Sequence, residues 1–371
     1  MSQLNFSKSE MVSQSIAAIS SVINGKHADE SAKHILFKSV SQDKIELYAT
    51  DKEIQVSIGF KPDVMLGTIN HAVNAARLRG IMGSIQNGAA LSMSLEQKVK
   101  LASEGMEISL PIFKGDFPVM PDFQPDSIIT LEAKPIYEAL SKVFPHISNG
   151  KGDKTLGGVY WHIGNSQALM NAAPDGTALA STMWAINTQA NEQIVLPLKV
   201  AKLIKDSLKD LTCFVHVKTN GDYVRFEVGN LAIQFARQEV LFPVAHYMGL
   251  CTVVVDNVKS PKKFKTEFAV KCADLAKSLR VAAQFGESVD VALNNSKLNF
   301  SLNNEAVGGF KSSITVNSTV DLTMKLSPIA LMSACSHLGA EVVTLSLDGQ
   351  TQGFAAKVSI PGAAIWLTAM N

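Results

Sequence analysis

The sequence repeats one pattern, a helix followed by several strands, at intervals of about 60 residues. Helical periodicity begins near residues 7, 70, 134, 197, 272 and 327, so the successive intervals are 63, 64, 63, 75 and 55 residues. An internal repeat constrains the fold more than any single motif, because equivalent units adopt equivalent architectures. We therefore expect an α+β chain of three similar domains, each built from two helix-plus-antiparallel-strands units.

Two periodicities in the apolar residues support this repeat. Apolar residues three or four positions apart predict helices over Ser7–Ile23, Asn70–Ile85, Lys134–Ile147, Pro197–Leu211, Cys272–Phe285 and Ser327–Leu338, with Ser7 as an N-cap and Gly339 as a stop. Alternating residues predict strands at 44–50, 53–58, 91–96, 99–103, 106–110, 224–228, 231–235, 289–293, 298–302 and 342–347. Asn-Gly pairs at 87, 149 and 220 are turn signals between them.

A Phe-Pro-Val triplet at residues 117–119 returns 125 residues later, at 242–244. Proline ends a strand because it lacks the backbone donor of the ladder. We interpret both triplets as domain-closing turns, which places the domains at residues 1–125, 126–250 and 251–371. The basic stretch 256–268 accounts for the longest interval, and we interpret it as a linker.

Composition excludes some classes of protein. With 46% hydrophobic and 18% charged residues, the chain can bury cores and is not disordered. The four cysteines form no C-x-x-C pair, and no apolar run is long enough to span a membrane, so we expect a cytoplasmic protein without metal or cofactor. A formal net charge of +1 does not exclude a nucleic-acid partner, because a basic face can be balanced by an acidic one.

Catalytic motifs are nearly absent from the sequence. It contains no G-x-x-x-x-G-K-[ST] loop, no G-x-S-x-G elbow and no H-E-x-x-H. Ser260 to Lys263 matches S-x-x-K, which leaves a Ser/Lys hydrolase as an alternative, although so short a motif occurs often by chance. Asp51 and Asp175 could be general bases, but an aspartate between two strands more often forms the turn. We expect a protein that is not an enzyme.

Basic residues gather on the predicted helices. Each could belong to an ordinary solvated helix face, but together they predict a basic surface suited to sequence-independent phosphate contacts. The residues expected to face DNA are Lys26, just beyond the end of the first helix, and the helix residues Arg77, Arg79, Lys142, Lys199, Lys202, Lys205, Lys277 and Arg280. A repeat-built binding scaffold unrelated to DNA is the other alternative.

Five stretches, in order, resemble a known family, the bacterial sliding clamp or beta subunit of DNA polymerase III. They are LYATDKEIQVSI (47–58), GDFPVMP (115–121), AAPDGTALA (172–180), VLPLKVAKLIKDSL (195–208) and VRFEVGNLAIQFARQEVLFPVAHY (224–247). The resemblance covers the first two predicted domains and is weaker in the third. It implies a head-to-tail homodimeric ring that encircles double-stranded DNA, tethers the replicative polymerase and other clamp-binding proteins, and is opened by a clamp-loader ATPase.

The resemblance also implies site residues. The loop residues Lys151 and Lys154 would contact DNA, and Met106, Ile108 and Phe285 would lie at the dimer interface. A partner-peptide pocket would be formed by Leu156, Pro174, Gly176, Thr177, Ala178, Leu179, Pro243, Tyr247, Met248, Gln352, Trp366, Leu367, Thr368, Ala369 and Met370. The chain departs from the family at Thr177-Ala178, where His-Arg is usual, and at its C-terminal IWLTAMN, where V-M-P-M-R-L is usual. The departures imply an altered peptide preference.

Overall fold

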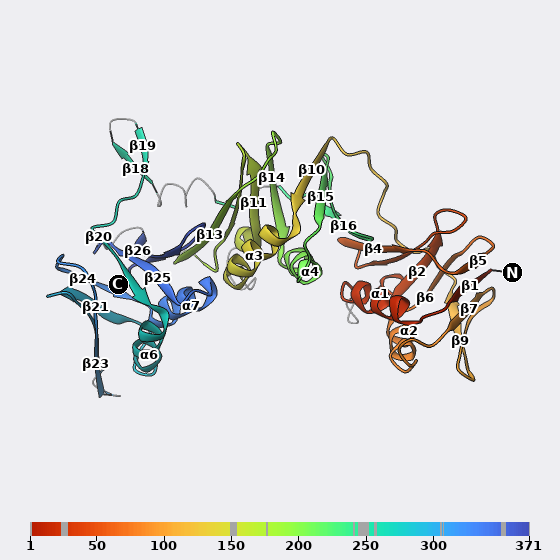
Figure 1. The fold of residues 1–371 in the computed structure, drawn as a ribbon, viewed down its shortest axis with the longest axis horizontal. Coiled ribbons are helices and arrows are strands. Elements are labelled where there is room, and N and C mark those ends of the chain that lie inside the picture. The colour runs from red at the N-terminus through yellow and green to blue at the C-terminus, as the bar shows by residue number, and fades with distance from the viewer. Residues whose placement is uncertain are drawn as a thin grey trace. The chain divides into compact units, whose positions relative to one another are not determined.

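The chain forms two compact units, described here from a computed structural model (Figure 1). The first unit comprises Met1–Lys134 and Asp206–Arg237, and the second comprises Pro135–Lys205 and Gln238–Asn371. The structure describes residues 2–23, 29–148, 154–175, 177–239, 242–243, 252–255, 258–304, 306, 308–349 and 354–370. The division into three domains stays a prediction.

The first unit contains one long antiparallel sheet and a pair of packed helices, α1 (Glu10–Ser20) and α2 (Ala75–Met82). Val12, Ile16 and Ile19 of α1 are fully buried. The described strands follow the order β10-β15-β16-β17-β4-β3-β2-β6-β9-β8-β7-β1-β5. Their bounds are β1 (Gln3–Phe6), β2 (His34–Ser39), β3 (Ile45–Thr50), β4 (Ile54–Phe60), β5 (Val64–Leu66), β6 (Asn70–Asn74), β7 (Leu91–Leu95), β8 (Lys98–Ser103), β9 (Met106–Phe113), β10 (Ser127–Glu132), β15 (Phe214–Thr219), β16 (Tyr223–Val228) and β17 (Leu231–Ala236).

Among the described residues, the second unit contains an eight-stranded sheet, a four-stranded sheet, the two-stranded β18–β19 sheet and most of the remaining helices. The eight-stranded sheet has the order β14-β11-β12-β13-β27-β26-β25-β20, and the four-stranded sheet has the order β23-β22-β21-β24. The strands are β11 (Gly158–Gly164), β12 (Gln167–Ala172), β13 (Ala178–Ala185), β14 (Glu192–Pro197), β18 (Thr252–Val255), β19 (Val258–Pro261), β20 (Thr266–Lys271), β21 (Val289–Asn294), β22 (Lys297–Asn304), β23 (Gly308–Thr315), β24 (Leu322–Leu326), β25 (Val342–Leu347), β26 (Phe354–Ile360) and β27 (Ala363–Thr368). Its helices are α6 (Cys272–Ala282) and α7 (Pro328–Leu338), together with most of α3 (Ala133–Val143) and of α4 (Leu198–Leu208).

The helices and antiparallel sheets of the structure confirm the expected α+β class. The signals predicted for the helix ends are confirmed in part. Ser327 caps α7 by accepting a hydrogen bond from the Ala330 N–H (3.3 Å), and Gly339 ends that helix in the left-handed region with φ 67°. The Ser7 cap was wrong, because α1 begins after Ser9, whose hydroxyl donates to the Gln86 carbonyl instead (3.1 Å).

Two predicted boundaries need correction. The helix expected over 70–85 begins only at Ala75, because residues 70–74 form β6 and pair with β2. Asn74 then caps α2 by accepting the Arg77 N–H (3.1 Å). The expected linker 256–268 contains β19, which pairs antiparallel with β18, and the start of β20.

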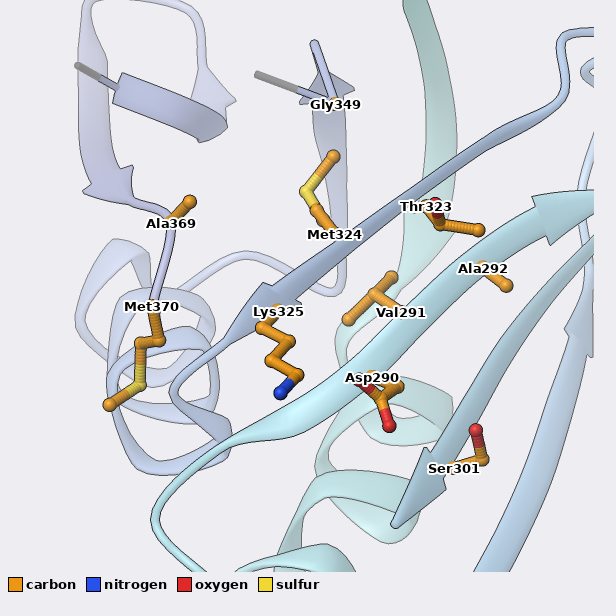
Figure 2. A pocket seen from close by; sticks show the side chains of 10 residues that line it. All are labelled: Asp290, Val291, Ala292, Ser301, Thr323, Met324, Lys325, Gly349, Ala369 and Met370. Atoms are coloured by element: carbon orange, nitrogen blue, oxygen red, sulfur yellow. The ribbon is translucent and has the colours of Figure 1, made fainter. Parts of the chain in front are cut away.

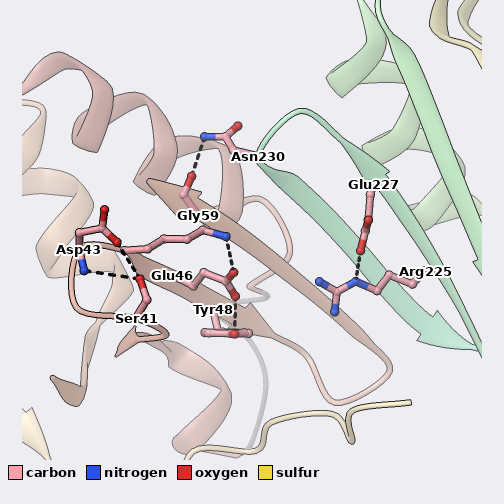
Figure 3. A network of polar contacts seen from close by, with 9 residues as sticks. Ser41, Asp43, Glu46, Tyr48, Gly59, Arg225, Glu227 and Asn230 are labelled. Atoms are coloured by element: carbon pink, nitrogen blue, oxygen red, sulfur yellow. Dashed lines mark hydrogen bonds and ion pairs between the residues drawn. The ribbon is translucent and has the colours of Figure 1, made fainter. Parts of the chain in front are cut away.

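Each long sheet is completed across a predicted domain boundary. β17 pairs with β4, with Leu231 opposite Ile58, and β13 pairs with β27, with Ala178 opposite Leu367. At the first of these β-pairings, the Asn230 amide donates to the Gly59 carbonyl (2.9 Å), as Figure 3 shows. Burial raises the pKa of Tyr48 in the polar network of Figure 3, and its hydrogen bond to Glu46 raises the pKa further.

The segment that follows β9 is fixed to the same β-pairing by buried glutamines. Gln55 accepts the Met120 N–H (2.8 Å), and the Gln234 amide donates to the Pro121 carbonyl (2.9 Å). Both glutamine side chains are buried, so these bonds satisfy groups that would otherwise be costly to desolvate. Residues 117–119 lie in this fixed connection, beyond the end of β9 at Phe113.

Candidate partner-binding pocket and basic helices

A cluster of buried side chains lies where the resemblance places the peptide pocket. Leu156, Tyr160, Ala173, Leu179, Phe242 and Phe354 pack together, and the half-buried Trp366 packs against them. The Tyr160 and Phe242 rings stack with centroids 5.7 Å apart, and Phe354 lies 5.8 Å from Trp366. Burial also raises the pKa of Tyr160. Side chains from distant parts of the sequence therefore form one apolar cluster within the second unit.

Solvent exposure divides the predicted pocket residues into a floor and a rim. Leu156, Ala178, Leu179 and Leu367 are buried, as expected for residues of a core. The residues with solvent-accessible surface are Pro174, Thr177, Pro243, Trp366, Thr368, Ala369 and Met370. This rim is accessible to solvent, whereas the side chains of the floor are not. Gly176, Tyr247, Met248 and Gln352 lie outside the described residues.

The position usually occupied by His-Arg in the family has a defined backbone role here. The Thr177 N–H donates to the Asp175 carboxylate (2.7 Å), and this hydrogen bond lies just before the start of β13. The Thr177 carbonyl accepts from both the N–H (2.9 Å) and the hydroxyl (3.2 Å) of Thr368. The two departures from the family pattern therefore lie beside each other and are joined by hydrogen bonds.

Sequence reasoning missed a group of aromatic and basic side chains beside Trp366. Phe264 lies 5.7 Å from Trp366 between ring centroids, and the Lys357 amine lies over both rings, 5.3 Å and 5.5 Å from their centroids. Lys262 forms a buried ion pair with Asp348 (3.0 Å) and donates to the Phe354 carbonyl. The pairing of β26 with β27 brings Lys357 opposite Trp366, and no local pattern indicates that register.

The predicted basic residues lie on four of the described helices. Arg77 and Arg79 on α2, Lys202 on α4, and Lys277 and Arg280 on α6 are exposed. Lys142 on α3, and Lys199 and Lys205 on α4, are half-buried, and the Lys205 amine lies 4.8 Å from the Phe144 ring centroid. Lys26 and Lys151 lie outside the described residues, as does the side chain of Lys154, whose backbone forms a short 3-10 turn.

Two of the predicted interface residues lie at a strand edge, and the third packs against another edge strand. Met106 is exposed and Ile108 is half-buried on β9, whose first residues pair with β8 on one side and with no described strand on the other. Phe285 follows α6 and stacks on Phe310 of β23 with centroids 6.3 Å apart. β23 is an edge strand in the described part of its sheet. Unpaired strand edges are suited to pairing with another chain.

The aspartates considered as general bases are turn residues. Asp51 accepts hydrogen bonds from the N–H groups of Glu53 (3.1 Å) and Ile54 (2.8 Å) between β3 and β4. Asp175 has the equivalent position before β13.

Among the described residues, no helix has the length and apolar character needed to span a membrane.

Repeated helix-plus-strands units, helix pairs and antiparallel sheets define this chain as having the DNA clamp fold. Solved structures with the same fold are DNA polymerase III beta subunits. The subunit from Thermotoga maritima has a TM-score of 0.86 at 18% identity, and that from Pseudomonas aeruginosa has 0.88 at 15% identity, each with 100% of both chains covered. The beta sliding clamp of C. crescentus has a TM-score of 0.85 at 18% identity and the same coverage. No protein-family model and no curated sequence matched this chain.

Proposed function

We propose that the chain is a DNA polymerase processivity factor, a sliding clamp without enzymatic activity. The observation that carries the proposal is the likeness in fold to DNA polymerase III beta subunits along the whole length of both chains. The exposed arginines and lysines on α2, α4 and α6 add the charge that a DNA-encircling surface needs.

The proposed clamp holds DNA by topology rather than by tight contacts. A closed ring cannot dissociate from circular duplex DNA even when each contact is weak. Arginine and lysine side chains attract phosphates without reading bases, so the ring slides. Specific base contacts would oppose that movement.

The ring would consist of two copies joined head to tail. If three similar domains each turn the chain by about 60°, two copies close the circle. The open edge of β9 in one copy and that of β23 in the other are suited to continue one sheet across each interface. Met106, Ile108 and Phe285 would supply the apolar contact beside that seam.

The rim around Trp366 would bind a short linear peptide of the replicative polymerase or of another replication or repair protein. Apolar anchors on a peptide suit a surface made of aromatic and aliphatic side chains. Tethering converts each release of the polymerase from DNA into a rapid rebinding, because the effective concentration stays high. A separate cytoplasmic clamp-loader ATPase would open and load the ring.

Loading onto nicked circular DNA tests the proposal directly. The full chain is loaded by a bacterial clamp loader with ATP, and the circle is then cut once with a restriction enzyme. We expect the protein to co-elute with the circle and to leave it within minutes of cutting, whereas a circle blocked at both cut ends retains it. Retention on unblocked linear DNA would show an ordinary DNA-binding protein, and a stable monomer at micromolar concentration would exclude the ring.

A further inference from the structure

A hollow of about 610 Å³ lies on the face of the sheet formed by β22, β21 and β24 (Figure 2). Asp290 and Ala292 of β21, Thr323 and Lys325 of β24, and Ser301 of β22 line it. Ala369 and Met370 border it at one side, as does Gly349. Its volume is within the range of ligand-binding pockets, but its polar side chains are accessible rather than buried. This geometry suits a polypeptide lying across the sheet better than an enclosed small molecule.

The hollow is continuous with the rim of the proposed peptide pocket. The Thr368 N–H donates to the Thr177 carbonyl at the rim (2.9 Å), and the Met370 N–H donates to the Lys325 carbonyl in the hollow (2.9 Å). Only Ala369 lies between these two donors, so one short stretch of backbone borders both surfaces. Ala369 and Met370 belong to the predicted pocket and to the hollow.

The charged side chains of the hollow follow a fixed order with increasing distance from the proposed peptide pocket. Lys325 lies next to Met370, Asp290 is directly opposite Lys325 on β21, and Ser301 is opposite Asp290 on β22. The Lys325 and Asp290 side chains are both exposed. Within the described residues neither side chain takes part in an ion pair or hydrogen bond. A ligand could therefore pair with each of them without breaking an existing bond.

We propose that this hollow binds the segment that flanks the pocket-binding motif of a partner protein, with an acidic side chain near the motif and a basic one farther from it. The inference rests on the proposed function, because the motif itself occupies the rim around Trp366. The acidic residue would face Lys325, and the basic residue would face Asp290. Opposite charges placed in this order would give specificity among partners that share the same apolar anchors.

Flanked peptides test the order of charges. A hexapeptide with two apolar anchors is selected from a library on the full-length protein and labelled with fluorescein. Four longer peptides are then made from it. Two carry an extension at the N-terminus and two carry one at the C-terminus. At each end the extension is either Glu-Ser-Lys or Lys-Ser-Glu, read outward from the motif. Fluorescence anisotropy gives the Kd of each. At one end we expect the form with glutamate near the motif to bind about three- to tenfold more tightly than the reversed form at low salt.

Charge reversal in the protein provides the decisive comparison. In the double variant Lys325→Asp/Asp290→Lys, we expect the preference between the two extensions to reverse while the bare hexapeptide keeps its Kd. Lys297→Asp, at an exposed position of the same sheet outside the hollow, is the control and leaves the preference unchanged. Equal binding of the two extensions at both ends, or a preference that survives the double variant, would overturn this inference alone. If the library yields no hexapeptide, the proposed pocket and this inference are both overturned.

Discussion

His146 and His337 form a pair of neutral rings in the second unit. His146 Nε2 lies 3.0 Å from His337 Nδ1, and the two rings meet edge to face with centroids 4.9 Å apart. Burial, with a smaller contribution from His337, lowers the pKa of His146 to about 4, and burial also lowers the pKa of His337. A hydrogen bond between two neutral imidazoles needs one protonated and one bare nitrogen at the contact.

We expect this pair to make the free energy of unfolding depend on pH. An unfolded histidine has a pKa of about 6.5. Between pH 6.5 and pH 4, His146 binds a proton in the unfolded chain but not in the folded one. The stability contributed by neutral His146 is therefore fully present above pH 6.5 and is lost as the pH falls toward 4. The loss from pH 7 to pH 4.5 is about 2–3 kcal/mol.

Urea unfolding at the two pH values measures this effect. The His146→Phe variant should lose less stability on acidification than the wild type, whereas a variant of the exposed His216, His216→Asn, should follow the wild type. An unchanged pH dependence in His146→Phe would contradict the assignment. The difference between variants is informative because the carboxylates titrate alike in all three proteins.

The two Phe-Pro-Val prolines allow a comparison at equivalent sequence positions. Pro118 and Pro243 are both half-buried, but only Pro243 belongs to the predicted pocket and directly follows the buried Phe242. We expect Pro243→Ala to raise the Kd of a pocket-binding peptide about three- to tenfold and Pro118→Ala to leave it unchanged. Peptide titration by fluorescence anisotropy checks this, and equal effects would show that the triplet serves architecture only.

At the scale of elements, α2 is the clearest candidate for DNA contact. Arg77 and Arg79 are exposed, and the helix contains no acidic residue. The other basic helices include acidic residues as well, such as Glu138 on α3, Asp206 on α4 and Asp274 on α6. Charge on α2 is therefore not offset within the helix itself.

Replacing both arginines of α2 should weaken DNA binding without regard to sequence. In Arg77→Ala/Arg79→Ala we expect the slope of log K against log salt to fall by about 2, because two phosphate contacts and their released counterions are lost. Anisotropy of a labelled duplex over a salt series gives that slope. Lys98→Ala, at an exposed position of β8, is the matched control. An unchanged slope in the double variant would place α2 away from DNA.

The boundaries of helices and strands were predictable where a local cap or turn signal was present and was given precedence over apolar periodicity. Ser327 and Gly339 delimit α7 as expected, because a cap and a left-handed glycine act within one turn. The Asn74 cap was an equally local signal, but apolar residues of β6 were assigned to the helix that follows. The strand in the predicted linker was missed because Val258 to Pro261 pair with β18 despite their polar composition.

At the scale of the whole molecule, the proposed ring depends on contacts between copies. Met106 on the open edge of β9 is 40% exposed, close to the 42% of Met11 on α1. We expect Met106→Asp to shift the protein from dimer to monomer at micromolar concentration, because a charge would be buried in an apolar seam. Met11→Asp should leave the dimer intact. Sedimentation velocity distinguishes these outcomes, and a dimeric Met106→Asp would place the interface elsewhere.

The sequence by itself determined the repeat, the element types and several turns of this protein. Each of these follows from near neighbours: periods of two and 3.6 residues, caps, and aspartates that bond to their own turn, as Asp51 does. Tertiary structure alone decided that β17 joins β4 and that β13 joins β27. The second pairing places Leu179 opposite Trp366, and a backbone hydrogen bond after β27 places Met370 beside Lys325. Strand register between distant segments depends on how whole faces pack, and no local pattern records it.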